Sequence, residues 1–269
     1  MMVRNGKMNG KQEENAQRIA KVIARAGVCS RRDAERFIAQ GRVKLNGVVL
    51  TTPACVVTAN DEIAVDEKPL PKKEETRVWR YYKPAGLVVS HRDEKGRKTV
   101  FDSLPETLPR VVSVGRLDLN SEGLLLLTND GTFARQMEMP ATGWVRRYRV
   151  RIHGKITPEN IAALEKGIEV DGVKYKSVRV VIDKEQSSNQ WLTVSLVEGK
   201  NREIRKLMES FGLPVTRLIR IAYGPFQLGN LEEGGVDEIC AKMLKEQLGK
   251  KIAFDAPAKR RFSKNVKKG

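Results

Sequence analysis

The spacing of hydrophobic residues predicts two short helices near the start of the chain. They follow a polar segment, residues 1–16, which shows no periodicity and is expected to be disordered. In the first helix apolar positions recur three and four residues apart as far as Gly27, which ends it. Ser30, with Asp33 three residues on, is typical of a helix cap, and the second helix ends at Gly41. The apolar positions of the two helices are Ile19, Val22, Ile23, Ala26, Ala34, Phe37 and Ile38.

Alternating hydrophobic and polar positions follow, as in strands buried on one face. Residues 43–45 and 48–50 predict a hairpin, because Asn46-Gly47 favours a tight turn between two strands, and residues 62–65 predict a further strand. A segment rich in proline and lysine then separates this small domain from a larger one. The predicted parts are the small domain (17–68), the linker (69–76), the larger domain (77–250) and a basic flexible tail (251–269).

The larger domain is expected to have an α+β fold, with a mostly antiparallel mixed sheet flanked by helices. Thr157-Pro158, for example, is typical of a helix start, and that helix ends near Gly167. The expected strands are residues 78–82, 87–90, 111–114, 124–127, 144–152, 170–182 with a turn at 171–172, 191–197, 215–221 and 226–228. The expected helices are residues 132–139, 158–167, 198–212 and 236–248.

One strand of this domain carries the candidate chemistry at its entrance. Residues 124–127 are four leucines in a row, which predicts a strand buried on both faces. A tight polar segment, residues 118–123, precedes them, and its residues favour turns. Asp118 therefore lies on a loop attached to a rigid strand, two residues after Arg116. Taken alone, an aspartate there is more often a turn former than a catalytic group.

Charge indicates an anionic partner. The chain has 50 lysine and arginine residues against 33 aspartate and glutamate residues, a formal net charge of +17. The two short helices and the hairpin have few acidic residues to offset their cations, whereas a merely solvated face would mix charges better. We expect these cations to form a phosphate-binding surface: Arg18, Lys21, Arg25, Arg31, Arg32, Arg36, Arg42 and Lys44.

Residues 144–152 alternate basic and apolar side chains, which predicts a strand with one cationic face. Tyr148 is expected to interrupt that face. An aromatic ring among arginines suits base stacking beside phosphate contacts, although a half-buried tyrosine of a sheet is the commoner arrangement.

Other functional classes find little support. The three cysteines and two histidines are widely spaced, so neither a disulfide framework nor a metal site is expected. We see no nucleotide-binding motif, no apolar run of membrane-spanning length and no secretory signal, and we expect a cytoplasmic protein without metal or cofactor.

Residues 115–131, Gly-Arg-Leu-Asp-Leu-Asn-Ser-Glu-Gly-Leu-Leu-Leu-Leu-Thr-Asn-Asp-Gly, resemble the catalytic segment of one family of ribosomal RNA pseudouridine synthases. That family, the RsuA family, comprises small-subunit enzymes (type A) and large-subunit enzymes (type B). Residues 26–35 and 41–47 resemble the S4 RNA-binding module. The resemblance covers roughly residues 15–250. It implies that Asp118 is the catalytic carboxylate and that the Lys83-Pro84 turn is mainly structural.

The resemblance also assigns roles around Asp118. It implies that Tyr148 lies on the target uracil, that Arg146 belongs to the same basic-x-Tyr strand, and that Ile204 contacts the base. It further implies that Arg205 pairs with Asp118, and we include Arg116 in the active-site support. Whether Asp118 acts as a nucleophile or as a base at the sugar stays open at this point.

The substrate follows from a local difference within the family. Residues 188–191 and 198–203 look more like the large-subunit enzymes of type B than the small-subunit enzymes of type A, where Tyr-His would follow the Gly-Lys pair. The expected partner is therefore ribosomal RNA, a large-subunit precursor first, with a small-subunit uridine as the alternative. A non-catalytic RNA-binding factor for ribosome assembly is a different class of function on the same scaffold, and duplex DNA binding has less support because no recognition helix is apparent.

Overall fold

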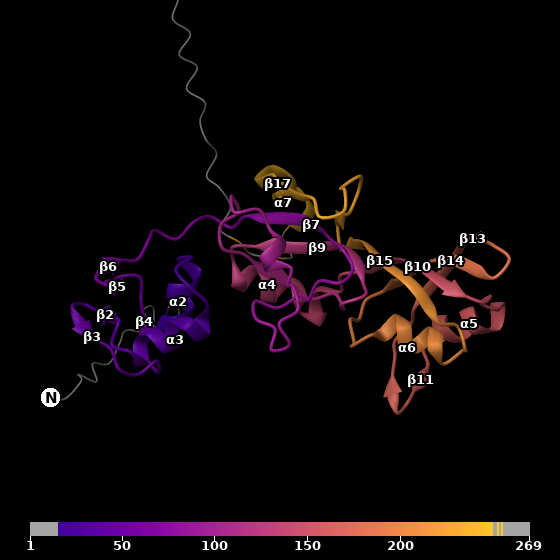
Figure 1. Cartoon of the computed structure of the whole chain (residues 1–269), viewed down its shortest axis with the longest axis horizontal. Coiled ribbons are helices and arrows are strands. Elements are labelled where there is room, and N and C mark those ends of the chain that lie inside the picture. Colours follow the sequence, from indigo (N-terminus) through magenta and orange to yellow (C-terminus); the bar gives the residue numbers. More distant parts are fainter. Residues whose placement is uncertain (1–15, 250–251, 253, 255–269) are drawn as a thin grey trace, which may run out of the picture. The chain divides into compact units, whose positions relative to one another are not determined.

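In the computed structural model, which describes residues 16–249, 252 and 254, the chain divides into two units, Met1–Glu75 and Thr76–Gly269 (Figure 1). Apart from Ala16, Ile252 and Phe254, the predicted disordered start and flexible tail lie outside the described residues. Ile252 is 4% exposed and the ring of Phe254 meets that of Phe133 edge-on, so these two residues of the predicted tail pack on the second unit. None of the helices in the described part of the chain has the length and apolar character that crossing a bilayer requires.

The first unit packs two helices on short strands. Ser30 caps the second helix: its Oγ accepts a hydrogen bond from the Asp33 amide at 3.0 Å. The apolar faces of both helices meet β2 and β5 in one core, which includes Ile23 and Ile38. The elements are β1 (Gln17–Arg18), α2 (Ile19–Arg25), α3 (Arg31–Ala39), β2 (Val43–Leu45), β3 (Val48–Val49), β4 (Val56–Val57), β5 (Ile63–Val65) and β6 (Lys68–Pro69).

The second unit is built on a mixed sheet whose strand order is β13-β14-β10-β15-β9-β7-β17, with β8 on β9 and β16 on β15. Only the β9–β15 pair is parallel among the pairs in this sheet of the described chain. The predicted α+β class with a mostly antiparallel sheet is confirmed. The strands are β7 (Val78–Lys83), β8 (Val112–Val114), β9 (Glu122–Thr128), β10 (Arg146–His153), β13 (Arg179–Glu185), β14 (Asn189–Leu196), β15 (Val215–Tyr223), β16 (Phe226–Gln227) and β17 (Val236–Ile239), beside a separate hairpin of β11 (Glu169–Val170) and β12 (Val173–Lys174).

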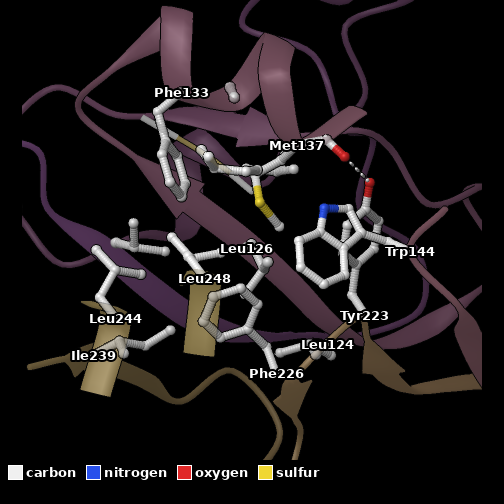
Figure 2. Close-up of a cluster of buried hydrophobic side chains, with 14 of the residues drawn as sticks. Leu124, Leu126, Phe133, Met137, Trp144, Tyr223, Phe226, Ile239, Leu244 and Leu248 are labelled. Carbon is white, nitrogen blue, oxygen red and sulfur yellow. Dashed lines mark hydrogen bonds between the residues drawn. The ribbon is translucent and has the colours of Figure 1, made fainter. Parts of the chain in front are cut away.

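Helices cover the sheet in two places. They are α4 (Gly131–Glu138), α5 (Pro158–Lys166), α6 (Glu203–Glu209) and α7 (Ala241–Leu248). Figure 2 shows side chains of α4 and α7 meeting Leu124 and Leu126 of β9 in one apolar cluster. Leu125 and Leu127 enter a second cluster, which the segment from Leu87 to Leu117 completes. The prediction that this strand is buried on both faces is confirmed, since all seven residues of β9 are buried.

Two predicted helices are partly wrong. Val236–Ile239, expected to begin the last helix, is strand β17, because its backbone pairs with β7 and Ile239 enters the core. Asp237 and Glu238 add ion pairs to Arg80 and Arg77. The expected helix 198–212 is helical only over α6, because Arg202 takes a left-handed conformation with φ 52°. In place of the expected strand 87–90 there is an isolated bridge between Val88 and Thr99.

Gly123 allows β9 and β15 to run side by side. A Cβ on Gly123 would lie 2.4 Å from the Arg220 carbonyl oxygen, and φ is +96°. Gly123→Ala should therefore destabilise the second unit by ~1–3 kcal/mol beyond the roughly 1 kcal/mol expected of Gly172→Ala, whose φ of +73° faces open space. All three tryptophans lie beyond residue 76, so urea unfolding followed by tryptophan fluorescence reports this unit alone. Equal losses in the two variants would contradict the close-approach argument.

Candidate active site

The second unit contains a cavity of about 660 Å³ beside the loop that leads into β9. Its walls come from β10, β15, the start of α6, and the segments before β9 and α6. Five residues predicted from the sequence line it: Arg116, Asp118, Arg146, Tyr148 and Ile204. Segments more than 80 positions apart in the sequence therefore meet around the Asp118 side chain.

Asp118 is half-buried at the start of a tight turn, in which its carbonyl oxygen accepts a hydrogen bond from the Ser121 amide at 3.0 Å. Gly86 of the Lys-Pro-x-Gly turn donates its amide to the Leu119 oxygen at 2.8 Å. These backbone hydrogen bonds fix the loop, and the fixed loop in turn holds the Asp118 side chain in position. The turn chemistry of the sequence predicted this loop.

Lys83 lies beneath the same loop with no exposed surface. Its Nζ donates to the carbonyl oxygens of Pro84 and Ser121 at 2.8 Å and to that of Leu119 at 3.3 Å. Burial lowers the pKa of Lys83 to about 8, against the opposing attraction of Asp118 and Glu122. The implied structural role of Lys83 is confirmed by these contacts.

Arg205 also supports the loop, but not by the contact expected of it. Its Nη2 donates to the Asn120 carbonyl and its Nη1 to the Val215 carbonyl, each at 2.9 Å. Burial lowers the pKa of Arg205, repulsion from Arg202 adds to this, and attraction to Asp118 opposes it. The expected direct pairing with Asp118 is therefore replaced, among the described residues, by a backbone clamp two residues further on.

Tyr148 lies on the buried side of β10, not on its cationic side. It alternates in step with Val150 and Ile152, which are fully buried, whereas Arg147 and Arg149 are exposed. The prediction that Tyr148 interrupts the cationic face is wrong, because side chains alternate along β10 and Tyr148 points away from Arg147 and Arg149. The register irregularity between Arg147 and Tyr148 does not change this alternation. Tyr148 lines the cavity together with Ile204, which is 4% exposed.

Arg146 lines the cavity but uses its donors on the protein itself. Its Nη1 donates to the Val197 oxygen at 2.8 Å and its Nη2 to the Tyr223 hydroxyl at 3.1 Å. That hydroxyl donates to the Met137 oxygen at 3.0 Å, a bond drawn in Figure 2. Arg146 therefore stabilises the wall of the cavity, a role that the sequence alone did not indicate.

Two buried charged residues of the cavity wall were not singled out from the sequence. Arg220 is 2% exposed, and its Nε donates to the Leu124 oxygen at 2.7 Å while Nη2 has no hydrogen-bond partner in the described chain. Glu203 is 4% exposed, accepts the Lys200 amide at 2.9 Å and keeps Oε1 without a partner in the same part of the chain. Burial raises the pKa of Glu203. A charged residue inside the apolar run 218–223 was the available signal for Arg220.

The predicted phosphate-binding cations of the first unit fall into two groups. Three are in ion pairs: Arg36 with Asp33, Arg42 with Asp66, and Lys44 with Glu67. Arg25 donates to the Glu74 carbonyl oxygen. Arg18, Lys21, Arg31 and Arg32 form no ion pair with any carboxylate of the described residues. These last four cations are therefore more available to an anion than the others.

A search of the described residues for three or more histidine, cysteine, aspartate or glutamate side chains able to hold a metal ion finds no such group. No described side chain is therefore assigned to a metal ion.

The buried ammonium of Lys83 should be visible in the pH dependence of stability. Between about pH 8 and pH 10.5 the folded protein binds fewer protons at Lys83 than the unfolded chain does. The free energy of unfolding should therefore rise with pH in that window relative to Lys83→Met, which cannot titrate. Lys83→Met should itself cost ~1–3 kcal/mol, because buried carbonyl groups lose their donor.

Urea unfolding across that pH range, followed by tryptophan fluorescence, measures both effects. Lys155→Met is the control, since Lys155 is exposed. Parallel pH profiles for wild type and Lys83→Met would contradict the lowered pKa.

Comparisons with known proteins assign each unit to a known family. A family model described as RNA pseudouridylate synthase matches residues 77–210, and the S4 domain model matches residues 17–63. A Rickettsia felis protein named an uncharacterized RNA pseudouridine synthase is 48% identical over 230 residues, which cover 86% of this chain and 100% of that protein. A Yersinia pestis protein named ribosomal large subunit pseudouridine synthase B is 40% identical over 233 residues, covering 84% and 73%.

A crystal structure described as pseudouridylate synthase superimposes with a TM-score of 0.61 at 26% sequence identity, covering 86% of this chain and 99% of that one. The chain therefore belongs to the RNA pseudouridine synthases of the RsuA family, which comprises the small-subunit enzymes of type A and the large-subunit enzymes of type B, and it carries an S4 domain in its first unit.

Proposed function

We propose that this protein converts a uridine of large-subunit ribosomal RNA into pseudouridine, with Asp118 as the carboxylate that acts at the ribose. The observation that carries the proposal is the half-buried Asp118 in a cavity shared with Tyr148 and Ile204. The names of relatives such as the Yersinia pestis protein support a target in the RNA of the large subunit. On this proposal the protein works beside ribosomal RNA in the cytoplasm.

The cavity suits one extruded nucleotide. Its volume of about 660 Å³ lies in the range of roughly 300–1,000 Å³ typical of small-ligand sites. Such a volume admits one nucleotide, base and ribose together, and is too small for a duplex. Flipping a base from its stack costs a few kcal/mol. Stacking on Tyr148 and contact with Ile204 offset that cost inside the cavity, while cations of the first unit hold the surrounding RNA.

The reaction is an isomerisation, so no group enters or leaves overall. The bond from ribose C1′ to uracil N1 breaks, the base turns within the cavity, and uracil C5 forms the new bond to C1′. The proton displaced from C5 leaves, and N1 gains one. Asp118 serves either as the nucleophile at C1′ or as a base at the sugar, and both roles need an ionised carboxylate in a fixed position.

Two cations, Lys83 and Arg205, help to keep Asp118 in a fixed position. Each donates its hydrogen bonds to carbonyl oxygens of the Asp118 loop or its neighbours, and each is electrostatically attracted to Asp118. They hold the Asp118 loop in place without occupying the carboxylate oxygens. The carboxylate therefore stays available to the ribose.

Asp118→Asn should abolish pseudouridine formation while RNA binding changes by no more than a few-fold, because the amide keeps the shape but loses the charge. The assay maps pseudouridine in large- and small-subunit ribosomal RNA from cells with the wild-type protein, with the variant and with neither. Turnover by the variant, once deamidation back to aspartate has been excluded by mass spectrometry, would remove Asp118 from the mechanism. A modified site in small-subunit RNA would replace the proposed target.

Arg205→Lys should lower the single-turnover rate by roughly 100-fold at saturating enzyme. Lysine keeps the charge but cannot span the Asn120 and Val215 carbonyls as the planar guanidinium does, so the Asp118 loop loses one anchor. Arg135→Lys on the exposed side of α4 is the matched control and should keep the wild-type rate. If Arg205→Lys reacts at the wild-type rate, the clamp does not position Asp118.

A further inference from the structure

The sheet of the second unit has an open face behind the cavity. Strand residues of the cavity wall include Tyr148, Leu196 and Leu218. Their neighbours in sequence point to the opposite side, because side chains alternate along a strand. In Figure 1 the helices α5 and α6 lie on one side of β13, β14 and β10, and no helix of the described chain covers the other side there.

Cations line this open face in register. Arg147 pairs across the sheet with Ser195, and Ser195 pairs with Arg179 of β13. The next two rows are Arg149 with Thr193 and Val181, and Arg151 with Trp191 and Lys184. We call this set the back-face patch: Arg147, Arg149, Arg151, Arg179, Lys184 and Trp191.

The patch has little internal charge compensation. Apart from the half-buried Arg151, its cations are exposed, and no carboxylate of the described residues forms an ion pair with any of them. The acidic side chains nearest in register are Asp183, which accepts the Thr193 hydroxyl at 2.9 Å, and Glu122, which is paired with Arg217 at 2.8 Å. On an ordinary solvent-exposed surface, positive and negative side chains would be interspersed.

The spacing also fits a polyanion. Arginines two residues apart on β10 recur about every 6.6 Å, comparable with the separation of successive phosphates along a nucleic-acid strand. Trp191 is half-buried, with the Arg149 guanidinium 4.7 Å from its ring centroid, and Val181 is 46% exposed. An aromatic ring and apolar surface beside cations are the features on which bases stack in RNA-binding sheets.

We infer that the back-face patch is a second RNA-binding surface, which contacts a part of the ribosomal RNA other than the segment that enters the cavity. The inference rests on the proposed function for the identity of the RNA. A large folded RNA can reach both faces of one small domain, whereas a short hairpin that fills the cavity cannot. The patch therefore contributes to affinity for long RNA and leaves the chemical step unchanged.

The test combines Arg147→Gln, Arg149→Gln and Arg179→Gln in the full-length protein and measures binding to a transcript of large-subunit ribosomal RNA against salt concentration. Loss of three phosphate contacts should lower the slope of log affinity against log salt by about 2–3. The matched control, Arg135→Gln with Lys166→Gln and Lys242→Gln, removes the same charge from exposed positions of α4, α5 and α7 and should keep the wild-type slope.

Equal slope changes in the two triple variants would overturn the inference, since only net charge would then matter. So would unchanged RNA binding accompanied by loss of binding to an acidic ribosomal protein. A second variant, Arg147→Gln with Arg179→Gln, leaves the Arg149–Trp191 contact intact; a slope reduced by about 1–2 supports the patch even if the triple variant fails to fold.

The binding assay is also made in the Asp118→Asn background, where no turnover occurs. If the proposed reaction is wrong, pseudouridine is absent from the mapped RNA while the slope difference between patch and control variants remains. If the patch is wrong, the modification is present and the slopes coincide.

Discussion

The geometry of the candidate site depends on one buried hydrogen-bond cluster, in which the Lys83 ammonium binds three carbonyl oxygens at the entrance to β9. An ammonium without exposed surface is costly unless its protons are used, and here each carbonyl it binds belongs to the Lys-Pro turn or to the Asp118 loop. Burial of the β9 leucines on both faces of the sheet offsets the cost of burying this ammonium. Two requirements therefore fix the loop: the apolar side chains of β9 must be buried, and the Lys83 ammonium must keep its hydrogen bonds.

The same logic explains why the cations around Asp118 bind backbone. Arg205 joins Asn120 to Val215, and Arg146 joins the segment before α6 to Tyr223. A direct ion pair would occupy the carboxylate oxygens, whereas a clamp on neighbouring carbonyls holds the loop and supplies a favourable field. Geometry and electrostatics are thus provided by the same side chains without blocking the proposed nucleophile or base.

Local patterns in the sequence predicted elements whose causes are local. The caps of α3 and α5, the strand of four leucines and the turn before it all form as the residue types require. The errors arise where distant partners decide. Val236–Ile239 becomes a strand because β7, more than 150 positions earlier in the sequence, pairs with it. Helix α6 starts late because Arg202 adopts a left-handed backbone conformation. The hydrogen-bond partners of Arg205 could not be predicted either, because they are backbone carbonyl oxygens, which every residue has.

Strand β10 shows how one register serves two purposes. Its even-numbered positions from Arg146 to Ile152 face the cavity and the apolar cluster beneath it, while Arg147, Arg149 and Arg151 face the other side. Because side chains alternate with period two, a slip of one residue would exchange the faces, burying arginines and exposing Val150. Burial of the apolar residues thus selects the register that brings Tyr148 to the cavity, and the same choice leaves the arginines in solvent. A cationic back face is therefore compatible with folding at little cost, and RNA contact is a use to which this otherwise neutral feature is well suited.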